Sequence, residues 1–337
     1  MDLAALEESL SRPSAPAVAA MAALTGDLVV LGAGGKLGPS LARMAARALQ
    51  EAGSAHGVIA VARFTKPAVR AELDRAGVCT VVCDLLDRRA LAALPDAGAV
   101  AFLAGTKFGT TGAEALTWAI NAWLPGLVAE RYTGVPTVVF SSGNVYPFVP
   151  VASGGATEAT PVDPIGEYAW SVVARERVFE HFSRTRGTPT TIYRLNYAAE
   201  LRYGVPLDIA LRVYRGETID LSNGHVNVLW QGDANAMALA CLTLAASPPR
   251  ILNVTGPRTL AVRELAQWFG SHFGREPSFA GVERDTALLS DSSQACAAFG
   301  PPRVSIEELC AWVAAWVAAG GATYDQPTHF EVRDGAF

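Results

Sequence analysis

The chain has 337 residues, enough for one large α/β domain or two unequal domains that bury a core without disulfides. Hydrophobic residues make up 50% of the chain and charged residues 18%, a composition that excludes disordered proteins and coiled coils. The net charge of −5 is modest and no block of like charges occurs. We therefore expect no nucleic-acid or membrane partner and favour a small-molecule ligand.

The cysteines are odd in number and form no C-x-x-C pair, which favours a reducing compartment. Cys79 and Cys83 fall on one predicted strand with Cα atoms about 13 Å apart, too far to share a zinc ion. We expect both to be core thiols and expect no metal site. The N-terminus carries acids where a signal peptide needs basic residues, and the longest apolar stretch, near 236–246, is too short to cross a bilayer. We predict a cytoplasmic protein.

Residues 1–25 are predicted to form a short helical extension that Pro13 and Pro16 interrupt. From Asp27 onward, apolar runs typical of strands alternate with stretches of helical periodicity. The predicted strands span residues 28–31, 57–63, 78–83, 99–103, 137–141, 190–195 and 251–254. The predicted helices span residues 36–52, 67–77, 88–94, 114–131, 168–185 and 232–246.

Strands that are apolar throughout and separated by helices are typical of parallel pairing with both sheet faces buried. The sequence therefore predicts an α/β fold with a doubly wound parallel Rossmann sheet. The sheet domain is expected to comprise residues 26–196 and about 228–256, and a smaller, discontinuous lobe residues 197–227 and 257–337. A sheet of this kind binds its ligand at the carboxyl ends of the strands.

A glycine-rich turn joins the first predicted strand to the first predicted helix. Gly32, Gly35 and Gly38 complete the pattern G-x-x-G-x-x-G, with Lys36 and Leu37 inside it. Dinucleotide sites need glycines here, because the backbone must turn tightly and approach the pyrophosphate while N–H groups at the helix start face the anion. An ordinary glycine-rich turn is the alternative. The pattern predicts that the sheet domain binds a dinucleotide, which leaves the smaller lobe for the substrate.

The second and third predicted strands end in residues that bear on the choice of dinucleotide. Arg63 stands where an acid would hold the ribose hydroxyls of NAD. An arginine offers a cation for a 2′-phosphate, so NADP is favoured over NAD, and a solvent-facing arginine is the alternative. Asp84, followed by Leu85, is a candidate acceptor for the adenine amino group or a turn residue.

These motifs resemble the extended short-chain dehydrogenase/reductase family, the NAD(P)-dependent epimerases and dehydratases, over roughly residues 27–317. The glycine turn and Asp84-Leu85 match the family's nucleotide segments. Lys107 is similar to a lysine beside the cofactor of UDP-galactose 4-epimerases, and Asn121 falls on the family's helix asparagine. Segments 141–146, 168–171 and 193–197 resemble the serine-bearing strand end, the tyrosine motif and the strand that enters the substrate lobe.

The resemblance implies roles for the residues in these segments. Ser142 and Tyr168 would be catalytic: the tyrosine hydroxyl exchanges a proton with the substrate while hydride moves to or from the nicotinamide, and the serine hydroxyl holds the same substrate oxygen. Asn144 and Asn196 would contact the substrate together with Ser142. Lys107 and Tyr168 would contact the cofactor.

Two positions depart from the family pattern. Where the family has a lysine four residues after the tyrosine, Val172 follows Tyr168. A cation about 4 Å away lowers a tyrosine pKa by roughly three units, so without it we expect Tyr168 to act as a neutral donor, which favours reduction. Lys107 and Arg175, the latter near the limit of its reach, are candidates for the missing charge. Val226 stands where nucleotide-sugar enzymes commonly carry an arginine, which disfavours a nucleotide sugar.

Two functions are compatible with this pattern. The first is an NAD(P)-dependent oxidoreductase, epimerase or dehydratase acting on a small sugar-like, polyol or keto substrate. The second is a catalytically silent NADP-binding sensor or scaffold, which Val172 favours. The joint presence of Ser142, Tyr168 and Asn196 favours the enzyme, since a sensor would not need them.

Other chemistry-bearing residues give weaker signals. His181 and His225 are more typical of exposed or packed histidines than of catalytic ones. Ser142 lies in no G-x-S-x-G elbow, so a hydrolase is disfavoured. Trp118 and Trp123 fit either a homodimer interface or the core, and residues 327–337 carry no motif.

Overall fold

The computed structural model describes residues 1–107, 109 and 111–335. Within these residues, a seven-stranded parallel sheet has the order β12-β7-β5-β4-β1-β2-β3. Its strands are β1 (Leu28–Leu31), β2 (Val58–Ala62), β3 (Cys79–Val82), β4 (Ala99–Phe102), β5 (Thr137–Ser142), β7 (Thr190–Leu195) and β12 (Arg250–Val254). The order reverses between β1 and β4, which creates a crevice at the carboxyl ends of the strands. The predicted doubly wound sheet is confirmed.

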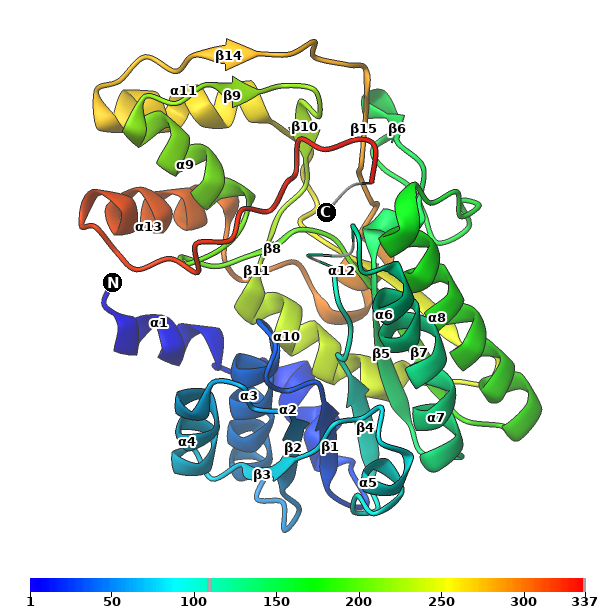
Figure 1. Cartoon of the computed structure of the whole chain (residues 1–337). Coiled ribbons are helices and arrows are strands. Elements are labelled where there is room, and N and C mark those ends of the chain that lie inside the picture. The colour runs from blue at the N-terminus through cyan, green and yellow to red at the C-terminus, as the bar shows by residue number, and fades with distance from the viewer. Residues whose placement is uncertain (108, 110, 336–337) are drawn as a thin grey trace.

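Helices cover both faces of this sheet (Figure 1). Successive side chains of β1 point to opposite faces, so Leu28 and Val30 pack into one core cluster and Val29 and Leu31 into another. The first face is covered by α2 (Ala15–Ala22), α3 (Gly38–Glu51) and α10 (Gln231–Ala240), and the second by α5 (Arg88–Ala92), α7 (Leu124–Arg131) and α8 (Gly166–Arg186). Burial on both faces explains why the strands are apolar throughout.

A second lobe stands over the carboxyl ends of the strands and has its own core. Its helices are α9 (Val205–Arg215), α11 (Val262–Phe273) and α13 (Ile306–Ala318), joined by α1 (Leu3–Leu10) from the N-terminus. Leu6 and Leu10 of α1 are fully buried in this core, whereas Met21 of α2 packs in the core of the sheet. The N-terminal extension therefore joins both parts of the molecule.

The remaining elements are short. Two-stranded sheets lie in the second lobe and at its border with the large sheet. They pair β6 (Val149–Pro150) with β15 (Thr286–Ala287), β8 (Ala198–Ala199) with β11 (Leu229–Trp230), β9 (Ile219–Asp220) with β14 (Phe279–Ala280), and β10 (His225–Val226) with β13 (Leu260–Ala261). The other α-helices of the described residues are α4 (Pro67–Arg75), α6 (Glu114–Trp118) and α12 (Ser293–Phe299), and short 3-10 turns span Gly143–Val145 and Val151–Ser153.

The helix expected over 114–131 is not continuous. A π-helical turn over Ala119–Trp123 separates α6 from α7. Pro125 has no N–H to donate to the carbonyl four residues earlier, that of Asn121, so the regular hydrogen-bond ladder cannot pass this point. The helix expected over 232–246 also ends early, because α10 passes into a 3-10 turn over Cys241–Leu244.

Three local expectations need correction. Cys83 is buried, but Cys79 is exposed, because β3 forms the edge of the sheet. Trp118 and Trp123 are 38% and 51% exposed, so the core alternative for them is wrong. Pro16 lies in the first turn of α2, which begins at Ala15, and does not interrupt a helix, since a proline is tolerated in the first turn. No helix in the described part of the chain has the length and apolar character that a membrane span requires.

Candidate functional site

Adjoining cavities occupy the crevice at the carboxyl ends of the strands. The lobe cavity, of about 370 Å³, lies between the sheet and the second lobe and is lined by Ser142 and Tyr168. The sheet cavity, of about 460 Å³, lies at the ends of β2 and β3 and is lined by Arg63 and Asp84. Both cavities are lined by Gly32, Gly35, Leu103, Gly105 and Thr106. They therefore form one continuous crevice.

The glycine turn borders both cavities, and glycine is needed at its three positions for different physical reasons. Gly32 has φ +89°, and a Cβ there would lie 2.6 Å from the backbone nitrogen of Ala104. A Cβ on Gly38 would lie 2.5 Å from the carbonyl oxygen of Ala33, so only glycine fits both positions. Gly35 is exposed toward the crevice, and a Cβ there would meet only the Gly32 carbonyl oxygen, at 3.4 Å. The turn thus keeps backbone open toward a ligand, as a pyrophosphate requires.

Two cationic side chains line the sheet cavity near the end of β2. Arg63 follows β2 and is exposed, and Lys66 lines the same cavity. Asp84 and Leu85 follow β3 and line it too. The Asp84 carboxylate accepts from the backbone N–H of Leu86 at 3.0 Å, so Asp84 combines a turn role with a place in the cavity. This end of the crevice suits a ligand with a negative charge beside an apolar ring.

Ser142 and Tyr168 meet in the lobe cavity. Ser142 ends β5 and Tyr168 lies in the first turn of α8, and their hydroxyls are hydrogen-bonded. The Ser142 hydroxyl also donates to Asn144 Oδ1 at 3.0 Å. Burial raises the pKa of Tyr168 more than Arg175 and Ser142 lower it. Tyr168 is therefore held as a neutral hydroxyl, in the state a proton donor needs.

Val172 is packed by apolar neighbours. It is fully buried in a cluster with Val145, Tyr146 and Val173, against which the Tyr168 ring also packs. A lysine at this position would have to bury its ammonium group among these apolar side chains, which is costly without a polar partner. The position that the family lysine takes is part of the core here.

Arg175 supplies positive charge from two turns further along α8. Its Nη1 donates to the Phe140 carbonyl oxygen and its Nη2 to Asn121 Oδ1, each at 2.7 Å, while its buried Nε has no hydrogen-bond partner among the described residues. A Cβ at position 105 would lie 2.5 Å from Arg175 Nη2, so Gly105 makes room for the guanidinium. The arginine lies within reach after all, and its charge lowers the pKa of Tyr168.

Asn121 lies in the π-helical turn and ties these segments together. Its Nδ2 donates to the Thr106 carbonyl oxygen and to Ser171 Oγ, each at 2.9 Å, and its Oδ1 accepts from the Thr106 N–H at 3.0 Å. Ser171 in turn donates to the carbonyl oxygen of Tyr168 at 2.7 Å. The π turn thus orients the loop that carries Lys107 and the first turn of α8.

The remaining predicted substrate residues also line the lobe cavity. Asn196 packs against Gly143, where a Cβ would lie 2.8 Å from Asn196 Cγ, and its Nδ2 donates to Asn227 Oδ1 at 3.2 Å. Val226 is fully buried in the core of the second lobe and lines neither cavity. His181 is exposed on α8, and neither His181 nor His225 lines these cavities.

The structure adds lining residues that the sequence did not indicate. Tyr197 and Tyr203 come from the second lobe, and Gln326 and Thr328 come from the C-terminal tail, which runs back from α13 across the molecule (Figure 1). Thr328 Oγ donates to Asp208 at 2.6 Å. In the sequence, only Phe330, an apolar residue between polar neighbours, indicates that the tail packs on the protein. Phe330 is buried in the second lobe's core and anchors the tail there.

A buried ion pair behind the site was also not predicted from the sequence. Arg194 Nη2 lies 2.6 Å from Glu176 Oε2, and both side chains are almost fully buried. Ser141 Oγ donates to the same carboxylate and Tyr146 accepts from Arg194. This network fixes β5, β7 and α8 beside Ser142 and Tyr168. Among the described residues, no cluster of three His, Cys, Asp or Glu side chains could hold a metal ion.

The glycine turn, the cationic strand end and the Ser142–Tyr168 pair define a dinucleotide-binding α/β protein of the oxidoreductase kind. A family model described as the NAD dependent epimerase/dehydratase family matches residues 28–199, more than half of the chain, so the chain belongs to this family. The family comprises enzymes, and the predicted family and enzyme class are confirmed.

Solved structures support the fold. The dTDP-glucose 4,6-dehydratase of Streptomyces venezuelae, with NAD bound, is similar with a TM-score of 0.73 at 21% identity, over 87% of this chain and 97% of that chain. The UDP-glucose 4-epimerase of Thermotoga maritima, with UDP-glucose, is similar with a TM-score of 0.70 at 20% identity, over 87% of this chain and 99% of that chain. Identities this low establish the fold alone. A comparison with curated protein sequences finds no match.

Proposed function

We propose that the chain is an NADP-linked enzyme that acts on a hydroxyl or carbonyl group of a small sugar-like, polyol or keto substrate. The observation that carries this proposal is the hydrogen-bonded Ser142–Tyr168 pair in a cavity continuous with a cation-lined dinucleotide crevice. The contacts of the described residues favour the enzyme over a silent sensor, because a sensor needs no proton donor at the far end of its cofactor site.

The cofactor would lie along both cavities. The backbone of the glycine turn, from Gly32 through Lys36 and Leu37 to Gly38, would face the pyrophosphate, and Asp84 and Leu85 would flank the adenine. Arg63, with Lys66, would bind the 2′-phosphate, which supports NADP over NAD. Tyr168 and Lys107 would lie at the nicotinamide end. When bound, the nicotinamide supplies or accepts the hydride.

The chain's own residues would handle the proton. Tyr168, whose raised pKa keeps it protonated, would donate to the substrate carbonyl oxygen, and Ser142 would hold the same oxygen. Asn144 and Asn196 would contact the rest of the substrate. Since no lysine follows at position 172 and a neutral tyrosine is a poor base, reduction is the favoured direction.

A small substrate, as opposed to a nucleotide sugar, stays a prediction. Val226 lies in the lobe core, and the tail residues Gln326 and Thr328 line the lobe cavity, both of which support a compact ligand. The structures of similar fold include an epimerase with UDP-glucose, so UDP-glucose belongs in any substrate panel.

A homodimer is a further part of the proposal. Trp118, Trp123, Trp170 and Leu116 are all more than one third exposed, and they come from α6, the π turn and α8. Neighbouring exposed aromatic side chains are typical of protein interfaces. Sedimentation of wild type against Trp123→Glu would show a loss of dimer; a monomeric wild type would contradict it.

Calorimetric titration and a coupled absorbance screen test the function. We expect NADP(H) to bind about ten- to a hundredfold more tightly than NAD(H), and NADPH to be oxidised with at least one sugar-like keto compound. Tighter binding of NAD would contradict the cofactor assignment. NADP binding without turnover across aldoses, ketoses, keto acids and nucleotide sugars would favour the sensor instead.

A further inference from the structure

Lys36 and Lys107 place two amino groups in the same part of the crevice. Both side chains are half-buried and line the lobe cavity, and neither lines the sheet cavity. The backbone of the turn, by contrast, borders both cavities at Gly32 and Gly35. The Lys36 side chain therefore turns away from the adenosine end and toward the second lobe.

Contacts with the second lobe fix this orientation. Lys36 Nζ lies 3.3 Å from the centroid of the Tyr203 ring, close enough for a cation–π contact. Glu200 and Asp208 also act on the charge of Lys36, but each carboxylate already accepts hydrogen bonds, from Arg202 and Thr328 respectively. The lobe thus holds the ammonium in place while the acids are engaged elsewhere.

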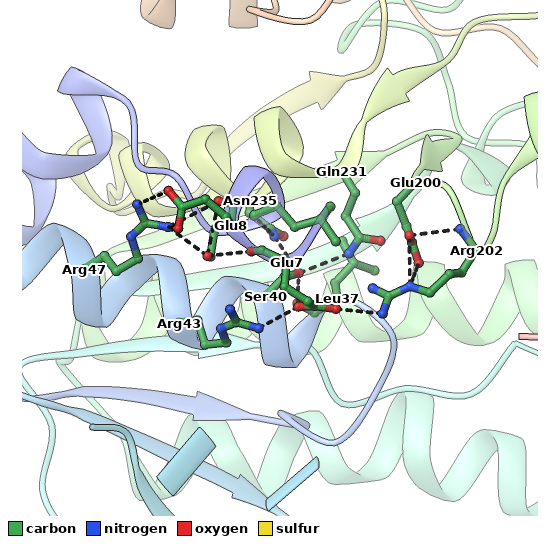
Figure 2. A network of polar contacts seen from close by, with 12 residues as sticks. Glu7, Glu8, Leu37, Ser40, Arg43, Arg47, Glu200, Arg202, Gln231 and Asn235 are labelled. Carbon is green, nitrogen blue, oxygen red and sulfur yellow. Dashed lines mark hydrogen bonds and ion pairs between the residues drawn. The ribbon is translucent and has the colours of Figure 1, made fainter. Parts of the chain in front are cut away.

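A chain of ion pairs holds the lobe side of this arrangement (Figure 2). Glu200 pairs with Arg202 at 3.0 Å, Arg202 Nη1 pairs with Glu7 of α1 at 2.7 Å, and Glu7 pairs with Arg43 of α3 at 2.6 Å. Tyr203 directly follows Arg202 in the chain. The ion pairs of Arg202 therefore also hold the backbone that carries the Tyr203 ring, which Lys36 contacts. The lysine is positioned from both parts of the molecule.

The electrostatics of the cavity call for an anion. Burial lowers the pKa of Lys36 to about 7, Glu200 and Asp208 oppose this, and Lys107 adds to it. Burial likewise lowers the pKa of Lys107 to about 8. A negatively charged ligand group between the two amino groups would replace their lost hydration and remove their mutual repulsion.

We propose that the substrate of the lobe cavity carries a compact anionic group, a carboxylate or a phosphate, and that Lys36 binds this group opposite Lys107. The substrate class is then a sugar acid, a hydroxy or keto acid, or a phosphorylated polyol. The inference rests on the proposed function, because it takes the lobe cavity as the substrate site. The position of Lys36 in the glycine turn also admits a contact with the cofactor's pyrophosphate, so the test separates these two anions.

The test measures binding to the full chain saturated with NADP, by thermal shift and titration at fixed ionic strength. The probes are inorganic phosphate, D-gluconate, D-glucose 6-phosphate, neutral D-glucose and UDP-glucose. We expect the first three to raise the melting temperature and D-glucose not to. Lys36→Met is expected to weaken D-gluconate and D-glucose 6-phosphate by about ten- to a hundredfold and leave the NADP affinity within threefold.

Matched variants make the outcome specific. Lys36→Arg keeps the charge and is expected to retain anion binding, while Arg215→Met removes one exposed cation of α9 and is expected to change nothing. Equal binding of D-glucose, unchanged anion affinity in Lys36→Met, or an equal loss of NADP affinity in that variant would each overturn the inference and leave the proposed function standing. Tightest binding of UDP-glucose would overturn the inference together with the small-substrate part of the proposed function, and would leave the NADP-linked enzyme. Failure of the wild type to bind NADP would overturn both.

Discussion

The two cavities of the crevice are built in different ways. The sheet cavity is made mainly from the ends of β1, β2, β3 and β4 and the residues just after them, with Val69, Leu116, Ile120 and Leu124 added from neighbouring helices. The lobe cavity is made from segments scattered between Gly32 and Thr328, including the C-terminal tail. With the cofactor and substrate placed as proposed, nucleotide binding is a local property of the sheet, whereas substrate choice depends on long-range packing. Single substitutions should separate the two.

The largest expected effect belongs to the lobe cavity. Tyr168→Phe removes the proton donor and is expected to lower turnover by about 10²–10⁴-fold while the NADP affinity stays unchanged. Tyr214→Phe, at a partly exposed tyrosine of α9, is the matched control. Steady-state kinetics and calorimetry of both variants check this. Turnover unaffected by Tyr168→Phe would remove this tyrosine from the mechanism.

The next effect belongs to the turn that both cavities share. Gly35→Val is expected to weaken NADP about a hundredfold or more while the protein stays folded, because a side chain there meets open crevice. Gly38→Val is expected to fail at folding instead, since its Cβ would lie 2.5 Å from the Ala33 carbonyl oxygen. Melting curves with and without NADP distinguish the two. A Gly35→Val protein that NADP still stabilises would show that the turn does not hold the phosphates.

A smaller effect is confined to the sheet cavity. Arg63→Met is expected to lower the NADP affinity about ten- to a hundredfold and to leave the NAD affinity nearly unchanged, because only NADP carries the 2′-phosphate. Titration of both cofactors with both proteins gives the ratio. An equal loss for both cofactors would place Arg63 elsewhere than at the 2′-phosphate.

The smallest effect concerns stability and pH. The pKa of Lys36 is about 7 in the folded protein and near 10.5 in the unfolded chain. Between pH 7 and pH 10.5 Lys36 is therefore protonated in the unfolded chain and largely neutral in the folded protein. The free energy of unfolding consequently rises with pH over this range. Lys36→Met removes this dependence. The variant is expected to be more stable than wild type by about 1–2 kcal/mol at pH 7, with the difference shrinking toward pH 10. Urea unfolding without added anions measures it; a constant difference would contradict the lowered pKa.

The sequence was informative wherever a function needs neighbouring residues. The strand before the glycine turn, Arg63 after β2, and Ser142 at the end of β5 could all be placed because strand ends of a parallel sheet share one edge. The departure at Val172 was also visible. The sequence also named Arg175 and Lys107 as candidates for the missing charge. It could not choose between them, because the position of Arg175 depends on Gly105 and Asn121 from other segments, and on a π turn that periodicity does not reveal.

The same reasoning explains what could not be predicted in the second lobe. Tyr203 and Thr328 enter the lobe cavity only because α9 and the tail pack on a core whose residues span almost the whole chain. The side-chain direction of Lys36 depends on that lobe as well. A glycine turn predicts backbone geometry, and it says nothing of where the lysine inside it points.

The first helix has a mechanical consequence for the crevice. Glu7 pairs with Arg43 on the sheet side and with Arg202 on the lobe side, while Leu6 and Leu10 anchor α1 in the lobe core. A hinge motion that separates α3 from the second lobe has to break one of these ion pairs. The three side chains are only 13–23% exposed, so these pairs are screened by salt less than pairs on the open surface. Removal of α1 would therefore cut these links between α3 and the second lobe and take Leu6 and Leu10 out of the lobe core.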